Sequence, residues 1–197
     1  MRVLLERAES EIEVKKSRFI AIAMPIKASE DVRKCVESIW KEHPDATHVV
    51  HAAVIGKSGT IYSSSDDREP KNTAGRPALE VLKGSGITDI IVCIVRYFGG
   101  TLLGTGGLVK AYSDSCKEVL RIVRTEELIE RKRFSLLIDY SSYTPIRRLL
   151  DRVEATEVKE VFETGISITG LIPEAKADEF RSGAADIGQG RLRVEIT

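Results

Sequence analysis

The fold is decided by residues 89–123, which read DIIVCIVRYFGGTLLGTGGLVKAYSDSCKEVLRIV. The run Asp89–Val95 is almost continuously apolar, which predicts a strand that is buried on both faces. The segment Leu108–Val123 carries apolar residues on one face at helical spacing, which predicts a long helix. Between them lies a glycine-rich loop, in which the backbone can approach a ligand closely. The stretch therefore predicts a strand, a loop with a candidate site, and a helix.

The residues upstream of this unit predict alternating strands and helices. Ser29 precedes two acidic residues, an arrangement typical of a capped helix start, and His43 with Pro44 indicates the end of that helix. Gly56–Gly59 indicates a turn between two strands. The expected elements are strands at Ser17–Met24, Thr47–Ile55 and Thr60–Tyr62, and helices at Ser29–His43 and Arg76–Gly84.

A charged segment at residues 124–133, RTEELIERKR, indicates a boundary between domains at 1–127 and 128–197. Beyond it the pattern is strand, helix, strand, strand, helix, strand, which is the ferredoxin-like βαββαβ arrangement. The sequence therefore predicts a two-domain α+β fold. In the second domain we expect strands at Phe134–Asp139, Glu157–Glu163, Gly165–Leu171 and Arg191–Ile196, and helices at Thr144–Val153 and Glu174–Asp186.

The composition is that of a globular protein, because 42% of the 197 residues are hydrophobic and 30% are charged. The formal net charge is zero, which excludes a global field that attracts nucleic acids or membranes. The first residues lack the apolar segment of a signal peptide, and no run approaches the roughly 18 apolar residues of a membrane span. Cys35, Cys93 and Cys116 match no ligand spacing and indicate free, buried thiols. We expect a cytoplasmic protein without a membrane partner.

The glycine-rich loop is the stronger of two candidate sites. Successive amide N–H groups at a helix start form an anion site, and the flanking Arg96 and Lys110 carry charges that pair with phosphate or carboxylate. The loop matches neither the phosphate loop of nucleotide hydrolases nor the dinucleotide fingerprint, because the required lysine and last glycine are missing. The alternative is that the glycines serve only a tight turn. The candidate anion-binding residues are Arg76, Arg96, Gly99, Gly100, Gly104, Thr105, Gly106, Gly107 and Lys110.

The second candidate site is the polar run before the helix at Arg76–Gly84. Three carboxylates within four residues suit a divalent cation or acid–base chemistry. The basic residues interleaved with them favour a solvated turn instead, so we predict no metal and no cofactor. Tyr97 and Phe98 suit base stacking if exposed and core packing if buried. The candidates from these two groups are Asp66, Asp67, Glu69, Thr73, Gly75, Tyr97 and Phe98.

The histidines give little support to catalysis. His48 and His51 lie three residues apart on a predicted strand, so they face opposite sides and do not share a pocket. No serine or cysteine carries a nucleophile motif. These observations favour a non-catalytic protein over an enzyme.

Two long motifs resemble the Impact/YigZ family: SSDDREPKNTAGRP at Ser64–Pro77 and VRYFGGTLLGTGGLVKAYSDS at Val95–Ser115. Arg68 stands where the family usually has glycine, and Lys71 with Asn72 stands where a Ser-Gly pair is common. On the preceding strand Thr47, His48 and Ala52 match the family, whereas Val50 and His51 replace its Cys and Trp. These replacements argue against a thiol or an aromatic platform on that strand.

The resemblance implies an N-terminal domain similar to the second domain of ribosomal protein S5. It also implies a C-terminal ferredoxin-like domain similar to the last domain of elongation factor G. The leading hypothesis is a non-catalytic binding or regulatory protein of the translation apparatus, with RNA, the ribosome or a protein as partner. It would contact RNA or another phosphate-bearing ligand through the Arg96–Gly107 loop. The alternatives are a magnesium-dependent enzyme acting on a phosphorylated or carboxylate small molecule, and a scaffold for a protein partner.

Overall fold

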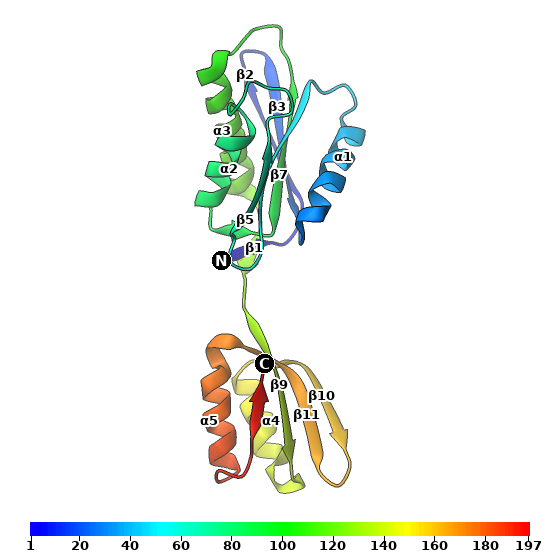
Figure 1. Cartoon of the computed structure of the whole chain (residues 1–197), viewed down its shortest axis with the longest axis vertical. Coiled ribbons are helices and arrows are strands. Elements are labelled where there is room, and N and C mark those ends of the chain that lie inside the picture. Colours follow the sequence, from blue (N-terminus) through cyan, green and yellow to red (C-terminus); the bar gives the residue numbers. More distant parts are fainter. The chain divides into compact units, whose positions relative to one another are not determined.

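The computed structural model describes residues 1–197 and divides into two compact units, Met1–Leu128 and Ile129–Thr197 (Figure 1). Each unit builds its own sheet and covers it with helices, so the chain has the expected two-domain α+β architecture. None of the helices combines the length and apolar character needed to cross a lipid bilayer.

The first unit is centred on a five-stranded antiparallel sheet with the order β2-β3-β7-β4-β5. The central strands are buried on both faces, as expected for β7, because helices cover the sheet on both sides. The sequence did not predict β2. The five strands are β2 (Ala8–Val14), β3 (Ser17–Pro25), β4 (His48–Ile55), β5 (Ile61–Ser65) and β7 (Ile90–Tyr97).

Helix α1 (Val32–Glu42) covers one face of this sheet, and helices α2 (Gly75–Gly84) and α3 (Gly104–Ile122) cover the other, as Figure 1 shows. Side chains alternate along β7, so Cys93 packs on the α1 side and Ile94 on the α2–α3 side. The face that a residue takes in this sheet therefore decides which helices it meets.

The expected capping role of Ser29 is wrong. A short 3₁₀ turn at Ser29–Asp31 precedes α1, and no side chain caps either element. A small second sheet, β6-β1-β8, joins β1 (Arg2–Leu4), β6 (Ile87–Thr88) and β8 (Thr125–Glu127).

The second unit has the ferredoxin-like topology, with the antiparallel order β10-β11-β9-β12. Phe134 and Phe180 meet edge to face in its core, with ring centroids 4.8 Å apart. Short 3₁₀ turns at Tyr140–Ser142 and Glu174–Lys176 precede its two helices. The elements are β9 (Arg131–Ile138), α4 (Tyr143–Arg152), β10 (Thr156–Phe162), β11 (Ile166–Pro173), α5 (Ala177–Ile187) and β12 (Val194–Ile196).

Candidate functional site

Strand register places three chemically distinct side chains side by side at one end of the central sheet. Arg96 on β7 lies opposite Phe19 on β3 and opposite His48 on β4. Side chains alternate with a period of two, and Ile94 and Val50 face the α2–α3 core, so Arg96 and His48 face the same way. The end of β7 thus directs a guanidinium group toward α3 instead of into open solvent.

Arg96 is only 5% exposed and is held by Glu69, which comes from the loop between β5 and α2. Nη1 of Arg96 donates to Oε1 of Glu69 at 2.6 Å, and the Tyr112 hydroxyl of α3 donates to the same oxygen at 2.7 Å. Burial, with the Glu69 carboxylate beside it, raises the pKa of Tyr112 far above its usual range, so this hydroxyl remains a donor. Because Glu69 neutralises Arg96, the expectation of a free cationic receptor needs correction.

The remainder of the guanidinium is less well satisfied. Nε of Arg96 is buried without a hydrogen-bond partner, and Nη2 makes no hydrogen bond within the chain. The group lies between the rings of Phe19 and Phe98, 5.5 Å from each centroid. Arg96 therefore keeps unused donor capacity at a buried position.

The carboxylates of the polar loop do not converge. The side chain of Asp66 accepts from the backbone N–H groups of Asn72, Ala74 and Gly75, and that of Asp67 accepts from the N–H of Val49 at 2.7 Å. Glu69 is paired with Arg96, so the three acidic groups have three different tasks. No group of three metal-ligating side chains forms in the structure. The acidic run shapes the loop, and the geometry does not favour a shared magnesium ion.

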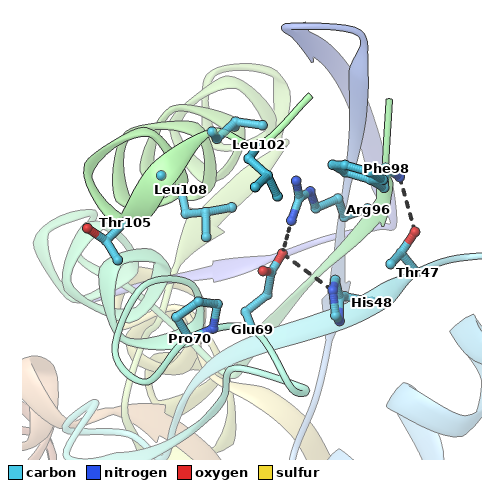
Figure 2. A pocket seen from close by; sticks show the side chains of 11 residues that line it. Thr47, His48, Glu69, Pro70, Arg96, Phe98, Leu102, Thr105 and Leu108 are labelled. Atoms are coloured by element: carbon cyan, nitrogen blue, oxygen red, sulfur yellow. Dashed lines mark hydrogen bonds and ion pairs between the residues drawn. The ribbon is translucent and has the colours of Figure 1, made fainter. Parts of the chain in front are cut away.

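A cavity of about 410 Å³ opens above the Arg96–Glu69 pair (Figure 2). Its floor is polar, since Glu69 and Arg96 are both nearly buried there and His48 lies beside them. Most of its wall is apolar. The lining residues are Thr47, His48, Glu69, Pro70, Arg96, Phe98, Leu102, Leu103, Gly104, Thr105 and Leu108.

The first turn of α3 forms one side of this cavity. The helix begins at Gly104, four residues before the expected Leu108, because Gly104 takes a φ of +74° that turns the chain into the helix. No side chain caps this end, and the N–H groups of Thr105 and Gly106 make no hydrogen bond within the chain. Open amides at the positive end of a helix dipole attract negative charge.

Two loop glycines and one lysine serve the fold and not the cavity. A Cβ at Gly99 would lie 2.0 Å from the backbone of Lys16, so this glycine permits close approach of the β2–β3 turn. Gly100 has a φ of +83°, a conformation that favours glycine. Lys110 is exposed and pairs with Asp114, one helical turn away. Gly107 lies within the first turn of α3, next to the Leu103 side chain.

Four further predicted residues lie outside the cavity. Arg76, a predicted anion-binding residue, is exposed at the start of α2 and lines a different depression with Val109 and Ser113, so it does not share the cavity with Arg96. Gly75 sits tightly against the backbone of β5, and the Thr73 hydroxyl donates to the Pro70 carbonyl at 2.6 Å. Tyr97 faces the α1 side, where its hydroxyl lies 2.9 Å from Nδ1 of His43.

His48 is one of the cavity residues that the sequence did not identify as a site residue. Its Nδ1 lies 2.7 Å from the backbone oxygen of Asp67, and its Nε2 lies 3.8 Å from Oε1 of Glu69. His51 faces the opposite side, as expected, and contacts the Ser63 hydroxyl; burial lowers the pKa of His51. The two-residue alternation of β4 indicates which face of the strand His48 takes. The position of His48 opposite Arg96 depends on the order of the strands, which the sequence pattern does not give.

The comparisons with known proteins point to the same family. The model of the Impact N-terminal domain matches residues 15–120. An IMPACT family member of Haemophilus influenzae is 37% identical over 94% of this chain and 91% of its own length. The IMPACT family member YigZ of Escherichia coli is 38% identical over 92% of this chain and 90% of its own length.

A crystal structure of a protein described as hypothetical has the same fold. It is 35% identical, covers 98% of this chain and 95% of its own, and superposes with a TM-score of 0.69. A family model that matches over half of the sequence, relatives similar over nearly their full lengths, and a shared fold lead to one conclusion: the chain belongs to the IMPACT family.

Proposed function

We propose that this chain is a non-catalytic RNA-binding protein of the translation apparatus, and that the cavity between β7 and α3 holds one nucleotide. The observation that carries the proposal is the open first turn of α3. Gly104 and Thr105 of this turn line a cavity with the buried Arg96 in its floor, and the Thr105 and Gly106 amides make no hydrogen bond within the chain. A phosphate group suits these donors, because it accepts several hydrogen bonds and its charge is stabilised by the helix dipole.

The charge of the site favours binding of one phosphate over binding of many successive phosphates along an RNA backbone. Glu69 already compensates Arg96, so the site offers amide dipoles and a spare guanidinium donor in place of net positive charge. Single-stranded RNA binding weakens with salt by a slope of about −0.7 per phosphate contacted. We expect a slope near this value and therefore binding that depends only weakly on salt.

The apolar wall supports a base beside that phosphate. Phe98 is 45% exposed and Leu102 is 83% exposed, and both line the cavity. A base that stacks on an exposed aromatic ring contributes about 1–3 kcal/mol without strict sequence preference. The placement in translation is supported by the resemblance of the two domains to parts of ribosomal protein S5 and elongation factor G, which is an argument from fold analogy.

The alternative of a magnesium-dependent enzyme has less support. It needs carboxylates that converge on the cavity, whereas Asp66 and Asp67 are bonded to backbone N–H groups of their own surroundings. Glu69 is the single loop carboxylate in the cavity, and its partners are Arg96 and Tyr112.

The test uses Gly106→Asp, which places a carboxylate on the amides that the phosphate would occupy. A Cβ at Gly106 meets no atom within 4 Å, and an acid in the first helical turn stabilises a helix by about 0.3–1 kcal/mol. We therefore expect an unchanged or higher thermal midpoint together with at least about tenfold weaker binding of a short single-stranded RNA, measured by fluorescence anisotropy.

Two variants serve as controls. Gly106→Asn has the size of the aspartate without its charge, and we expect it to bind more tightly than Gly106→Asp. Arg76→Ala removes an exposed arginine outside the cavity, and we expect it to bind like the unchanged protein. Equal affinities for all variants, or no binding by the unchanged protein at about 100 μM, the weak end of non-specific binding, would overturn the proposal.

A further inference from the structure

We propose, resting on the proposed function, that Nε2 of His48 accepts a hydrogen bond from the ribose 2′-hydroxyl and so selects RNA over DNA. The first step is the protonation pattern of the imidazole ring. Nδ1 of His48 lies 2.7 Å from the carbonyl oxygen of Asp67, and a carbonyl oxygen can only accept a hydrogen bond. Nδ1 therefore carries the proton, and Nε2 of the neutral ring is left as an acceptor.

The second step is that Nε2 makes no hydrogen bond within the chain. Oε1 of Glu69 lies 3.8 Å from it, which is beyond hydrogen-bond distance, and that oxygen is itself an acceptor, so the two atoms form an ion pair only when the ring is protonated. That oxygen already receives hydrogen bonds from Arg96 and Tyr112. The His48 side chain is only 15% exposed, so an unused acceptor here depends on a donor that enters the cavity.

The third step compares the polar groups of the cavity. The open amides of α3 and Nη2 of Arg96 are donors, and His48 supplies a nitrogen acceptor oriented by a backbone carbonyl. The complementary ligand carries an anionic acceptor and, close to it, a neutral hydroxyl donor. In a nucleotide of RNA the phosphate and the 2′-hydroxyl stand in that relation, whereas DNA lacks the hydroxyl.

Figure 2 shows the arrangement that this recognition needs. His48 and Arg96 lie on either side of the Glu69 carboxylate, with the Phe98 ring above them and Leu108 and Thr105 on the α3 side. A sugar bound over the floor would meet His48 while its phosphate lies toward α3 and its base toward Phe98. The sugar is thus the part of the ligand that would contact the floor of the cavity, where His48 lies.

The experiment compares three fluorescent oligonucleotides of one single-stranded sequence: RNA, DNA and 2′-O-methyl RNA. The methylated sugar keeps an oxygen that accepts but cannot donate, and DNA has neither. We expect the unchanged protein to bind RNA about tenfold more tightly than either analogue, the effect of one buried acceptor left unpaired. The DNA arm shows that the loss with the methylated strand does not come from the size of the methyl group.

The matched variant is His48→Asn, whose side-chain amide N–H can still donate to the Asp67 carbonyl but which has no acceptor at the place of Nε2. We expect it to bind RNA, DNA and 2′-O-methyl RNA with equal affinity, at the level that the unchanged protein shows for DNA. The control is His51→Asn, on the opposite face of the sheet, which should keep the tenfold preference.

The outcomes separate the two proposals. If the unchanged protein binds all three oligonucleotides equally, or if His48→Asn keeps the preference for RNA, the role of His48 is overturned and the RNA-binding function stands. If the unchanged protein binds none of the three oligonucleotides, both proposals fail. Should His48→Asn unfold, equal binding of the three oligonucleotides by the unchanged protein would still overturn the role of His48.

Discussion

Three residues in the loop between β5 and α2 adopt a left-handed backbone although none of them is glycine. The φ angles are 41° for Asp67, 68° for Arg68 and 62° for Asn72. These turns bring the Asp67 carboxylate to the backbone of β4 and point Glu69 at Arg96. The family resemblance agrees with this reading, because glycine is the usual residue at the position of Arg68. The strained backbone of this loop thus positions Glu69 in the floor of the cavity.

The strain at Arg68 predicts that Arg68→Gly stabilises the protein. A left-handed conformation costs an ordinary residue about 1–2 kcal/mol, of which the greater flexibility of unfolded glycine cancels about 0.5–1. The Arg68 side chain is exposed and its ion pair with Asp67 is 3.7 Å long, so the loss of this pair costs little. We expect the free energy of unfolding in urea to rise by about 0.5–1 kcal/mol. In the control Arg76→Gly, within α2, it should fall by a similar amount, and a fall for both variants would contradict the strain argument.

At the scale of elements, the periodic segments were predictable and the element ends were not. Apolar periodicity predicts α3 only from Leu108, because the preceding turn borders the cavity and not the core. Strand β2 carries acidic residues at every second position, with partly buried residues between them such as Ile12, and this alternation was an available but unused signal.

The residues of the site show why sequence patterns reach only part of it. The sequence identified both loops, the glycine-rich loop before α3 and the acidic loop before α2, because unusual composition is a local property. The pairing of Glu69 with Arg96 depends on the order of the strands, which no local pattern contains. Arg76 belongs to the same motif as Glu69, yet the start of α2 turns it into another depression. Proximity in sequence was therefore a poor guide to proximity in the cavity.

The close approach of the loop after β7 to the β2–β3 turn predicts that Gly99→Ala is destabilising. The added Cβ would stand 2.0 Å from the Lys16 carbonyl group, which is backbone and cannot rotate away. We expect the free energy of unfolding to fall by about 2 kcal/mol, the usual effect of overpacking. The control is Gly84→Ala at the end of α2, where a Cβ meets nothing within 4 Å and a small gain is expected. If both variants have the stability of the unchanged protein in urea denaturation, the contact is not as tight as described.

At the scale of the molecule, the two units have separate hydrophobic cores. The first unit buries one apolar layer on each face of its five-stranded sheet, and the second buries one layer between its sheet and two helices. No cluster of buried apolar residues contains members of both units. Units with independent cores are expected to unfold independently.

The prediction uses Trp40, the single tryptophan of the chain, which lies in α1 and reports on the first unit alone. Phe180→Ala removes a fully buried ring from the second core, at a cost of about 3–5 kcal/mol. We expect thermal unfolding followed by far-UV circular dichroism to gain an early transition, while the fluorescence transition of Trp40 keeps its midpoint. A joint shift of both signals would mean that the units unfold as one body.

In the small sheet β6-β1-β8, the order of synthesis on the ribosome limits when the strands can pair. Strand β1 leaves the ribosome before both of its neighbours. The first neighbour is β6 (Ile87–Thr88), and the second is β8 (Thr125–Glu127). At about 5–20 residues per second, roughly 6–25 s of synthesis separate the first strand from its last partner. The small sheet can therefore be completed only when β8 has been made, so β1 lacks its second neighbour until the segment leading into the second unit emerges.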